Sequence, residues 1–217
     1  MKKCLILANG NPPKKSLIVY LSKIGFETLI CADGGANTAL RYEIVPEYII
    51  GDLDSIKPET YDYYYDKCEI IQTKRQNDTD VEKCLKFVIK HKYAEAILLG
   101  GTGDRLDHSF CNLGIVLKYS DKISAKVIHE KSLLSVYEGN VKLKTIPGET
   151  ISIYGFDEKT KIKSYGLKYP LKNILLPFGK RESTSNSAIA KDVRLQIRGG
   201  KVFVIRDFEV MRNNGLF

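Results

Sequence analysis

The chain has 217 residues, of which 43% are hydrophobic and 28% charged, an ordinary composition for a globular protein of one large or two modest domains. No stretch approaches the roughly 20 consecutive apolar residues of a membrane-spanning helix, and the first apolar run stops at the Gly/Pro-containing segment 9–13, which disfavours a signal peptide. The formal net charge of +8 would suit an anionic partner such as nucleic acid.

The first 122 residues predict alternating strands and helices. Apolar runs at 3–8, 28–32, 48–50, 69–72 and 96–99 predict short buried strands. Helical segments follow each of them, near 16–24, through about residue 42, from Pro58, over 81–89 and to about Lys118. This alternation predicts an α/β domain over residues 1–122, with a mostly parallel sheet covered by helices on both faces.

After residue 122 the hydrophobic period changes from helical to alternating. Short alternating stretches lie at 126–129, 133–137, 141–143, 150–154, 161–167 and 193–197. Turn signals separate several of them, and the glycine pair within 198–201 predicts a hairpin turn. No segment here shows a helical pattern. We therefore predict a smaller antiparallel β-sandwich as a second domain, residues 123–217.

The excess of positive charge lies entirely in this second part. Residues 1–122 carry 17 basic and 17 acidic side chains, whereas residues 123–217 carry 17 and 9. The lysines stand singly at alternating positions, which favours the solvated faces of strands over a nucleic-acid groove. A nucleic-acid-binding regulator that uses the basic β domain is the alternative from another class of function.

The five cysteines indicate a reducing compartment. They stand at positions 4, 31, 68, 84 and 111 and form no Cys-x-x-Cys pair, so neither a zinc site nor a disulfide framework is expected. We expect a cytoplasmic protein.

Aspartates follow the predicted strands of the first domain. Asp52 and Asp54 come directly after strand 48–50; the others are Asp33, Asp78, Asp80, Asp104 and Asp107. Each pair alone is also consistent with a solvated acidic turn. Because ligands of open α/β sheets bind at the carboxyl ends of the strands, so many acids at one edge favour a site for a hard cation such as Mg²⁺.

Two glycine-rich segments, 33–35 and 100–103, accompany these acids at predicted helix starts. Such backbone can bind phosphate, although tight turns explain glycine equally well, and neither segment is a Walker A motif. Arg105 follows the second segment, and its guanidinium suits phosphate oxygens. Metal carboxylates, glycine loops and an arginine together favour phosphoryl transfer. His108 is either a base or a residue that caps or packs the helix.

Together these segments resemble the thiamine pyrophosphokinase family. The resemblance rests on Ala-Asp-Gly-Gly-Ala-Asn at 32–37, Gly-Asp-x-Asp-Ser at 51–55, Thr-Asp at 79–80 and the Gly-rich Arg-x-Asp-His segment at 100–108. The second part adds Tyr-Gly-Leu-Lys-Tyr-Pro-Leu at 165–171 and Ser-Thr-Ser-Asn at 183–186. The resemblance spans about residues 31–205, with the motifs in the family's order.

The resemblance implies Mg²⁺-dependent transfer of the pyrophosphoryl group of ATP to thiamine, giving thiamine diphosphate and AMP. It implies a homodimer in which ATP and Mg²⁺ bind the α/β domain and thiamine packs against the partner's β domain, so that active sites lie at the subunit interface. No nucleic acid or membrane partner is expected.

The family's functional positions carry over by matched motif. Mg²⁺ would be held by Asp52, Asp54 and Asp80; Arg105 would stabilise charge on the phosphates, and Asp107 would lie near the reacting hydroxyl. The nucleotide site would include Asp33, Gly34, Gly35, Asn37, Gln76, Thr79, Gly101 and His108, and the thiamine pyrimidine would contact Ser185 and Asn186.

Two departures from the family stand out. Asn77 replaces a usual aspartate, next to Asp78, and the chain has no tryptophan to stack on thiamine; Tyr169, Phe178 and Phe203 are the aromatic candidates. A Mg²⁺-dependent phosphotransferase with another alcohol acceptor is the alternative within enzymes.

Overall fold

The computed structural model describes residues 1–74, 77–103 and 105–217. The chain divides into two compact units, Met1–Glu130 and Lys131–Phe217. Strand β6 (Ser124–His129) belongs to the first unit, where it pairs in parallel with β5 (Glu95–Leu99). The boundary therefore falls later than residue 122. The sequence predicts β6 in the second domain because its alternating pattern resembles that of an antiparallel strand.

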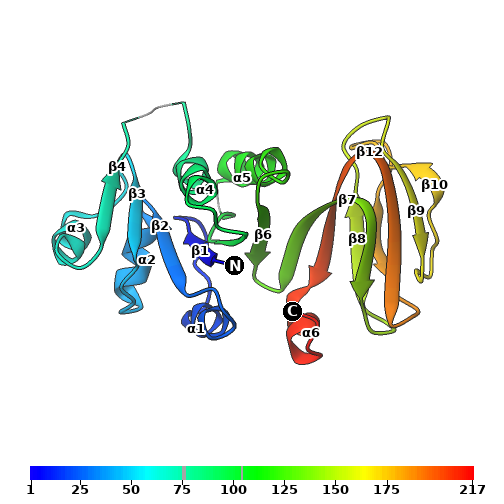
Figure 1. Ribbon diagram of the computed structural model, residues 1–217, viewed down its shortest axis with the longest axis horizontal. Helices are drawn as coiled ribbons and strands as arrows, with labels where there is room; N and C mark the ends of the chain where they lie inside the picture. The colour runs from blue at the N-terminus through cyan, green and yellow to red at the C-terminus, as the bar shows by residue number, and fades with distance from the viewer. Residues whose placement is uncertain (75–76, 104) are drawn as a thin grey trace. The chain divides into compact units, whose positions relative to one another are not determined.

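Strands and helices alternate along the first unit (Figure 1), as predicted. Ahead of β5 come β1 (Lys3–Leu7), α1 (Lys15–Lys23), β2 (Thr28–Ala32), α2 (Gly35–Arg41), β3 (Tyr48–Gly51), α3 (Pro58–Tyr64), β4 (Glu69–Gln72) and α4 (Asp80–Lys90), and α5 (Leu106–Lys118) joins β5 to β6. The strands β1 and β5 are almost entirely buried, as expected for a parallel sheet covered on both faces.

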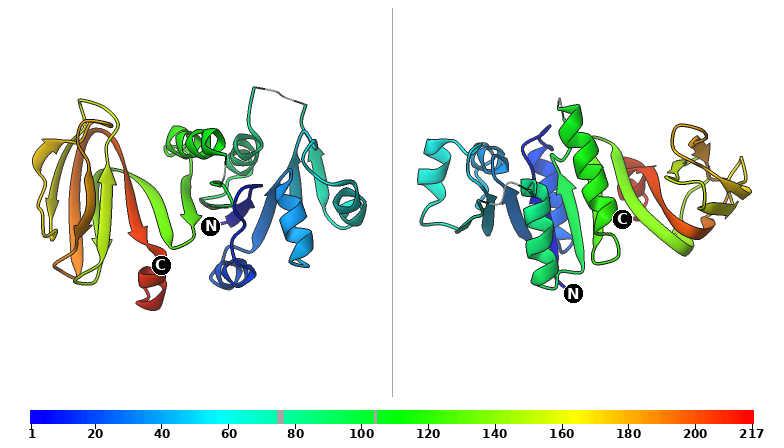
Figure 2. Two further views of the ribbon diagram at one scale, coloured as in Figure 1. Left: turned by 180° about the vertical axis from the view of Figure 1, so that it is seen from behind. Right: turned by 90° about the horizontal axis from the view of Figure 1, so that it is seen from above.

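The order of the parallel strands, β6-β5-β1-β2-β3-β4, contains a reversal of direction. From β1 to β4, each strand is added beside the previous one on the same side of β1. The chain then returns to the other side of β1, where β5 and β6 are added in the opposite direction. Because such crossovers are right-handed, α1–α3 and α4–α5 cover opposite faces (Figure 2). The reversal lies between β1 and β5, where loops diverge and ligands of such sheets bind.

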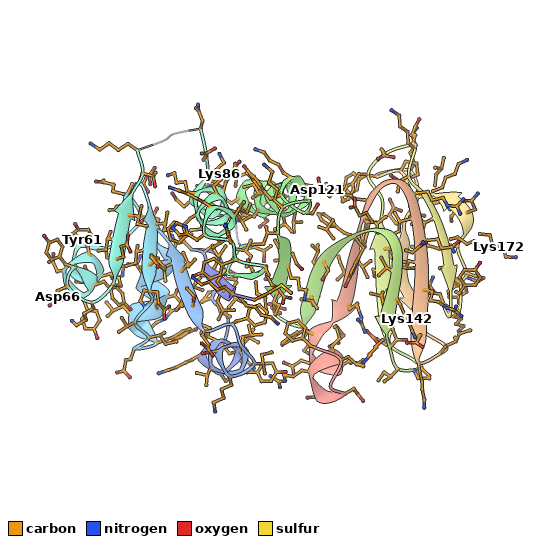
Figure 3. All side chains as sticks on the ribbon, viewed as in Figure 1. Tyr61, Asp66, Lys86, Asp121, Lys142 and Lys172 are labelled. Carbon is orange, nitrogen blue, oxygen red and sulfur yellow. The ribbon has the colours of Figure 1, made fainter. Side chains whose placement is uncertain are left out.

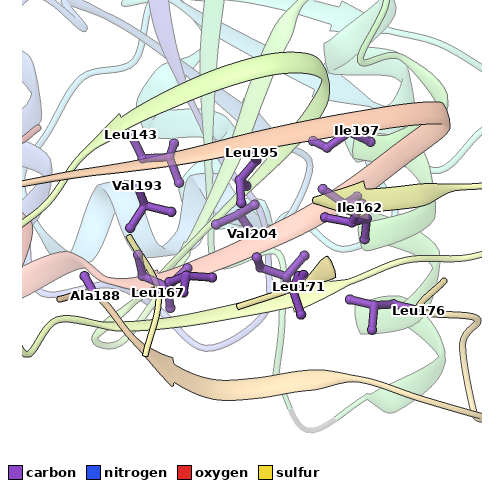
Figure 4. Packing of buried hydrophobic residues seen from close by; sticks show 13 residues of the cluster. Leu143, Ile162, Leu167, Leu171, Leu176, Ala188, Val193, Leu195, Ile197 and Val204 are labelled. Carbon is purple, nitrogen blue, oxygen red and sulfur yellow. The ribbon is translucent and has the colours of Figure 1, made fainter. Parts of the chain in front are cut away.

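Antiparallel strands build the second unit around the 16-residue β12 (Asp192–Asp207). One edge of β12 pairs with β7 (Ser132–Lys144), and the other pairs first with β9 (Lys161–Tyr165) and then with β8 (Thr150–Tyr154). The short strands β10 (Lys172–Leu175) and β11 (Ser183–Ser187) pair with β9 and β8. Side chains from β8, β9 and β12 meet in one apolar core (Figure 4).

The predicted hairpin turn at 198–201 is wrong. Strand β12 continues through it, and β7 likewise continues through 138–140, one of the segments whose residues favour a turn between the predicted strands. The register of their pairing shifts between Ile197 and Val202, where Gly139 (φ 67°) and Gly199 (φ 89°) adopt left-handed backbone. The glycines therefore mark a bulge that bends two long strands, and only long-range pairing distinguishes a bulge from a hairpin.

The second unit also contains a helix where none was expected, α6 (Phe208–Asn213). Asp207 begins it by accepting a hydrogen bond from the Val210 N–H at 2.9 Å, an N-cap that ends the long strand. Strands β10 and β11 were not predicted either. Throughout the described ranges, no helix is long and apolar enough to cross a membrane.

Candidate active site

A cavity of about 340 Å³ lies in the first unit where β1, β2, β3 and β5 end and α4 and α5 begin. This is the C-terminal edge of the parallel sheet, on either side of its reversal between β1 and β5. Eight of the positions carried over from the family line it: Asp33, Gly34, Asp52, Thr79, Asp80, Gly101, Arg105 and His108. Asp78 lines it as well. Gly35, Asn37, Asp54 and Asp107 are not among its lining residues, and Gln76 lies outside the described residues.

The buried Asp33 anchors the loop that follows β3. Its side chain is almost inaccessible, and its two oxygens accept hydrogen bonds from the N–H groups of Ser55 (3.1 Å) and Ile56 (2.9 Å). Asn37 assists through its side-chain amide, which donates to the Ser55 carbonyl and accepts from the Lys57 N–H, both at 3.0 Å. Asp33 and Asn37 therefore shape the loop directly.

Left-handed backbone at Leu53 (φ 69°) separates the two aspartates of this loop. Bulky residues rarely adopt that conformation, and such outliers gather at functional sites. Asp52, Asp33 and Asp80 bring carboxylate oxygens within 4.8 Å of one another. Asp54 lies outside this group and accepts a hydrogen bond from the Ser55 hydroxyl at 2.9 Å. The structure thus gathers Asp33, rather than Asp54, with the other two predicted ligands.

The donor set of this carboxylate cluster (Asp33, Asp52 and Asp80) fits a hard divalent cation such as Mg²⁺, which takes oxygen ligands. One oxygen of Asp52, Oδ1, is buried and has no hydrogen-bond partner among the residues that the structure describes, although buried polar atoms are normally paired. A cation held here would bind this oxygen of Asp52 and would offset the repulsion among the three carboxylates.

That repulsion affects the protonation of Asp33. Burial, followed by the charge of Asp80 and a contact with Asp54, raises the pKa of the Asp33 carboxyl to about 6, while the hydrogen bonds from Ser55 and Ile56 act in the opposite direction. Proximity to a bound cation would favour the ionised form again.

Lys83 is a residue of this cluster that the sequence analysis did not single out. Its Nζ lies 2.8 Å from Asp80 Oδ1 and 3.7 Å from Asp52 Oδ2, and its side chain is only 4% exposed. Burial alone would lower the pKa of the ammonium, but the hydrogen bond to Asp80 and the charges of Asp80 and Asp52 raise it above the ordinary value. The available signal was spacing, since residues three apart share a helix face.

Helix α4 begins at a position that directs Asp80 toward Asp33 and Asp52. Thr79 is the N-cap, and its hydroxyl accepts a hydrogen bond from the Glu82 N–H at 3.3 Å. The cap fixes the first turn of the helix, in which both Asp80 and Lys83 stand. Thr79 therefore positions the cluster as well as lining the cavity.

The glycine-rich loop after β5 packs directly on the loop after β1. Gly100 has left-handed backbone (φ 62°), and a side chain there would meet the Ala8 carbonyl oxygen at 2.5 Å. The N–H of Gly10 donates to the Gly100 carbonyl at 2.8 Å, and the Asn112 amide donates to the Gly101 carbonyl at 2.7 Å. These bonds hold bare backbone against the cavity, where phosphate oxygens can approach N–H groups.

Arg105 and Asp107 form an exposed ion pair at the start of α5. The guanidinium donates to both carboxylate oxygens, at 2.6 and 3.3 Å, and the side chains are 66% and 65% exposed. The hydrogen bond from Arg105 lowers the pKa of Asp107 below its ordinary value. The distance from His108 Nε2 to Asp107 Oδ2 is 4.0 Å.

In the second unit, the side-chain amide of Asn186 is fully engaged with protein groups. It accepts from the N–H groups of Tyr169 (3.1 Å) and Ser187 (2.9 Å) and donates to the Tyr169 carbonyl (2.7 Å) and the Ser183 hydroxyl (3.2 Å). The residue is 2% exposed. Asn186 therefore fixes the backbone of Tyr169, whereas its neighbour Ser185 is exposed.

The three aromatic candidates for stacking differ in exposure. Tyr169 and Phe178 are 63% and 61% exposed. Phe203 is buried and packs edge-on against Phe156, with 4.7 Å between ring centroids. Phe203 belongs to the packing of the unit, which leaves the other two able to meet a ligand.

Comparisons with known proteins agree in both units. The family models "Thiamin pyrophosphokinase, catalytic domain" and "Thiamin pyrophosphokinase, vitamin B1 binding domain" match residues 24–128 and 139–202. The chain is similar to thiamine pyrophosphokinase 2 of Oryza sativa subsp. japonica, with 28% identity over 90% of this chain and 82% of that protein. It is also similar to thiamin pyrophosphokinase 1 of Caenorhabditis elegans, with 26% identity over 81% and 77%.

A solved structure supports the fold. The thiamine pyrophosphokinase from Bacillus subtilis is similar with a TM-score of 0.80 and 23% identity, covering 95% of this chain and 99% of that chain.

We predict that Gly51→Ala weakens Mg²⁺ binding by roughly 10- to 100-fold, the usual cost of disturbing groups that orient metal ligands. The added methyl group would lie 2.7 Å from Asp33 Cβ and 3.2 Å from Asp80 Oδ1, so the carboxylates must move apart. Titration calorimetry with Mg²⁺ measures the effect.

The matched control is Gly114→Ala in α5, where an added methyl group meets nothing within 4 Å. This variant should bind Mg²⁺ as the native protein does and gain about 1 kcal/mol of stability from helix propensity. Unchanged Mg²⁺ affinity in Gly51→Ala would contradict the assignment of the cluster as a cation site.

Proposed function

The chain belongs to the thiamin pyrophosphokinase family, and we propose that it transfers the pyrophosphoryl group of ATP to the hydroxyl of thiamine in a Mg²⁺-dependent reaction that releases AMP. It is an enzyme, and thiamine diphosphate is its product. The observation that carries the dependence on Mg²⁺ is the carboxylate cluster at the C-terminal edge of the parallel sheet, with a buried Asp52 oxygen that no described residue hydrogen-bonds.

The cluster would hold Mg²⁺ through Asp52, Asp80 and Asp33, with Asp54 beside Asp33. Bound there, Mg²⁺ would neutralise the polyphosphate and make its β-phosphorus easier to attack. The backbone of the 100–103 loop and Gly34 would surround the phosphates, with Thr79 and His108 lining the same cavity. Gly35 and Asn37 would act indirectly, by holding the neighbouring backbone.

Arg105 and Asp107 are proposed to act on the transferred group and the acceptor. The Arg105 guanidinium would turn from Asp107 toward the phosphate oxygens, where its planar fork matches their geometry. Asp107, released from this ion pair, would accept the proton from the thiamine hydroxyl as its oxygen bonds to phosphorus and AMP departs. Both side chains are exposed enough to make this exchange.

The second unit is proposed to be an antiparallel β-sandwich that binds thiamine. We assign the stacking surface to Tyr169, because its ring is exposed while Asn186 fixes its backbone on both sides. An aromatic face suits the flat pyrimidine and the positively charged thiazolium of thiamine. Ser185 would supply a polar contact, with Asn186 in a positioning role.

The basic residues of the second unit do not favour the nucleic-acid alternative. Lys142 and Lys172 project separately from it (Figure 3), and Lys142 pairs with Asp192 at 3.1 Å. We propose a cytoplasmic enzyme without nucleic-acid or membrane partners, consistent with its five free cysteines. By resemblance to the family, we also propose a homodimer whose active sites lie at the subunit interface.

We predict that incubation with ATP, Mg²⁺ and thiamine yields AMP and thiamine diphosphate in equal amounts. Chromatography that resolves AMP from ADP measures the products. Asp52→Asn should lower the rate by about 100-fold or more through loss of a metal ligand, whereas Asp66→Asn, at an exposed position after α3 (Figure 3), should not. Production of ADP would identify an ordinary kinase and refute the proposed reaction.

We predict partial recovery of activity when two inactive variants exchange subunits. Asp52→Asn removes a proposed Mg²⁺ ligand from the first unit, and Tyr169→Ala removes an exposed ring from the second. Both variants should fold. In a mixed symmetric dimer with shared sites, one site collects both defects and the other none. About half of the dimers are mixed after random exchange, so about a quarter of native activity should return. No recovery after verified exchange would exclude shared sites.

A further inference from the structure

Lys83 places a buried positive charge inside the carboxylate cluster. It stands three residues after Asp80 on α4, with its ammonium nitrogen 2.8 Å from Asp80 Oδ1 and 3.7 Å from Asp52 Oδ2. Its side chain is 4% exposed, so water cannot replace these partners. Burying a charge this deeply is unfavourable unless its partners compensate it. Lys83 is neither one of the proposed cation ligands nor one of the groups proposed to act on the phosphates or the acceptor.

The ammonium and a divalent cation can occupy the cluster together. Asp52 directs Oδ2 toward Lys83, whereas its Oδ1 is buried and has no hydrogen-bond partner within the described ranges. Three carboxylates and one ammonium carry a formal charge of −2, which one divalent cation cancels. Without the ammonium, three negative groups with oxygens within 4.8 Å of one another would face a cation alone.

We propose that Lys83 is a positioning residue that holds Asp80 and Asp52 together in the metal-free protein and limits the affinity of the cluster for a divalent cation. The proposal rests on the cation site of the proposed function. A positive charge beside the cation weakens its binding, and Mg²⁺ is commonly held by one or two carboxylates together with substrate phosphates. Moderate affinity would let Mg²⁺ enter and leave with the nucleotide.

The test is Lys83→Met, which removes the charge and keeps most of the buried chain. In EDTA the variant should melt several degrees below the native protein, because the carboxylates then repel one another without compensation. Saturating Mg²⁺ should raise its melting temperature more than that of the native protein. Mn²⁺, measured by electron paramagnetic resonance, should bind the variant about tenfold more tightly than the native protein. A purely structural lysine would not produce tighter binding.

Lys86→Met is the matched control on the same helix (Figure 3). Lys86 also pairs with carboxylates, at 2.6 Å from Asp78 and 3.6 Å from Glu82, but neither belongs to the cluster. Its loss should leave Mn²⁺ affinity close to native. The double variant Lys83→Met with Asp80→Asn removes one charge of each sign and should recover stability in EDTA relative to Lys83→Met.

Weaker or unchanged Mn²⁺ binding in Lys83→Met would overturn the proposal. So would native stability of Lys83→Met in EDTA, or failure of the double variant to recover stability, including a failure of both variants to fold. These results are distinguishable from failure of the proposed function. If the native protein itself binds no Mn²⁺ at millimolar concentration, the cation site is wrong; if only the effect of Lys83→Met is missing, the role of Lys83 is wrong.

Discussion

The buried carboxylate of Asp33 accepts hydrogen bonds from the N–H groups of Ser55 and Ile56, and the geometry of the site depends on this contact. It fixes the loop after β3 so that the left-handed turn at Leu53 directs Asp52 toward Asp80. The contact also brings a third negative charge to the same place. The contact that holds the loop therefore also adds to the negative charge of the cluster, and the Lys83 ammonium offsets part of that charge.

The parallel sheet explains why these groups meet at one edge. Strand order reverses between β1 and β5, and hydrogen bonds join their following loops into a backbone surface beside the carboxylates. Arg105 and Asp107 stand where α5 leaves this surface. The second unit contributes a different chemistry, an exposed aromatic ring whose backbone is fixed by the amide of Asn186. We thus assign the charge chemistry and the aromatic recognition to separate units.

Local patterns in the sequence predict much of this arrangement. Apolar runs indicate the parallel strands, and aspartates after the strands indicate the acidic edge, because both depend on neighbours along the chain. Asp52, and not Asp54, points toward the cluster because of the left-handed backbone at Leu53. A leucine in the sequence does not predict that conformation. The burial of Lys83 and the saturated amide of Asn186 depend on contacts between distant segments. The bulge in β12 was mistaken for a hairpin for the same reason.

We propose that Asp33, Asp52 and Asp80 together form the cation site at which the polyphosphate reacts. Anomalous X-ray diffraction from crystals grown with Mn²⁺ and a non-hydrolysable ATP analogue tests it most directly. We predict a Mn²⁺ peak within bonding distance of Asp33, Asp52 and Asp80, with the phosphates of the analogue extending toward the 100–103 loop. A nucleotide bound in the cavity with its Mn²⁺ away from these carboxylates would contradict it.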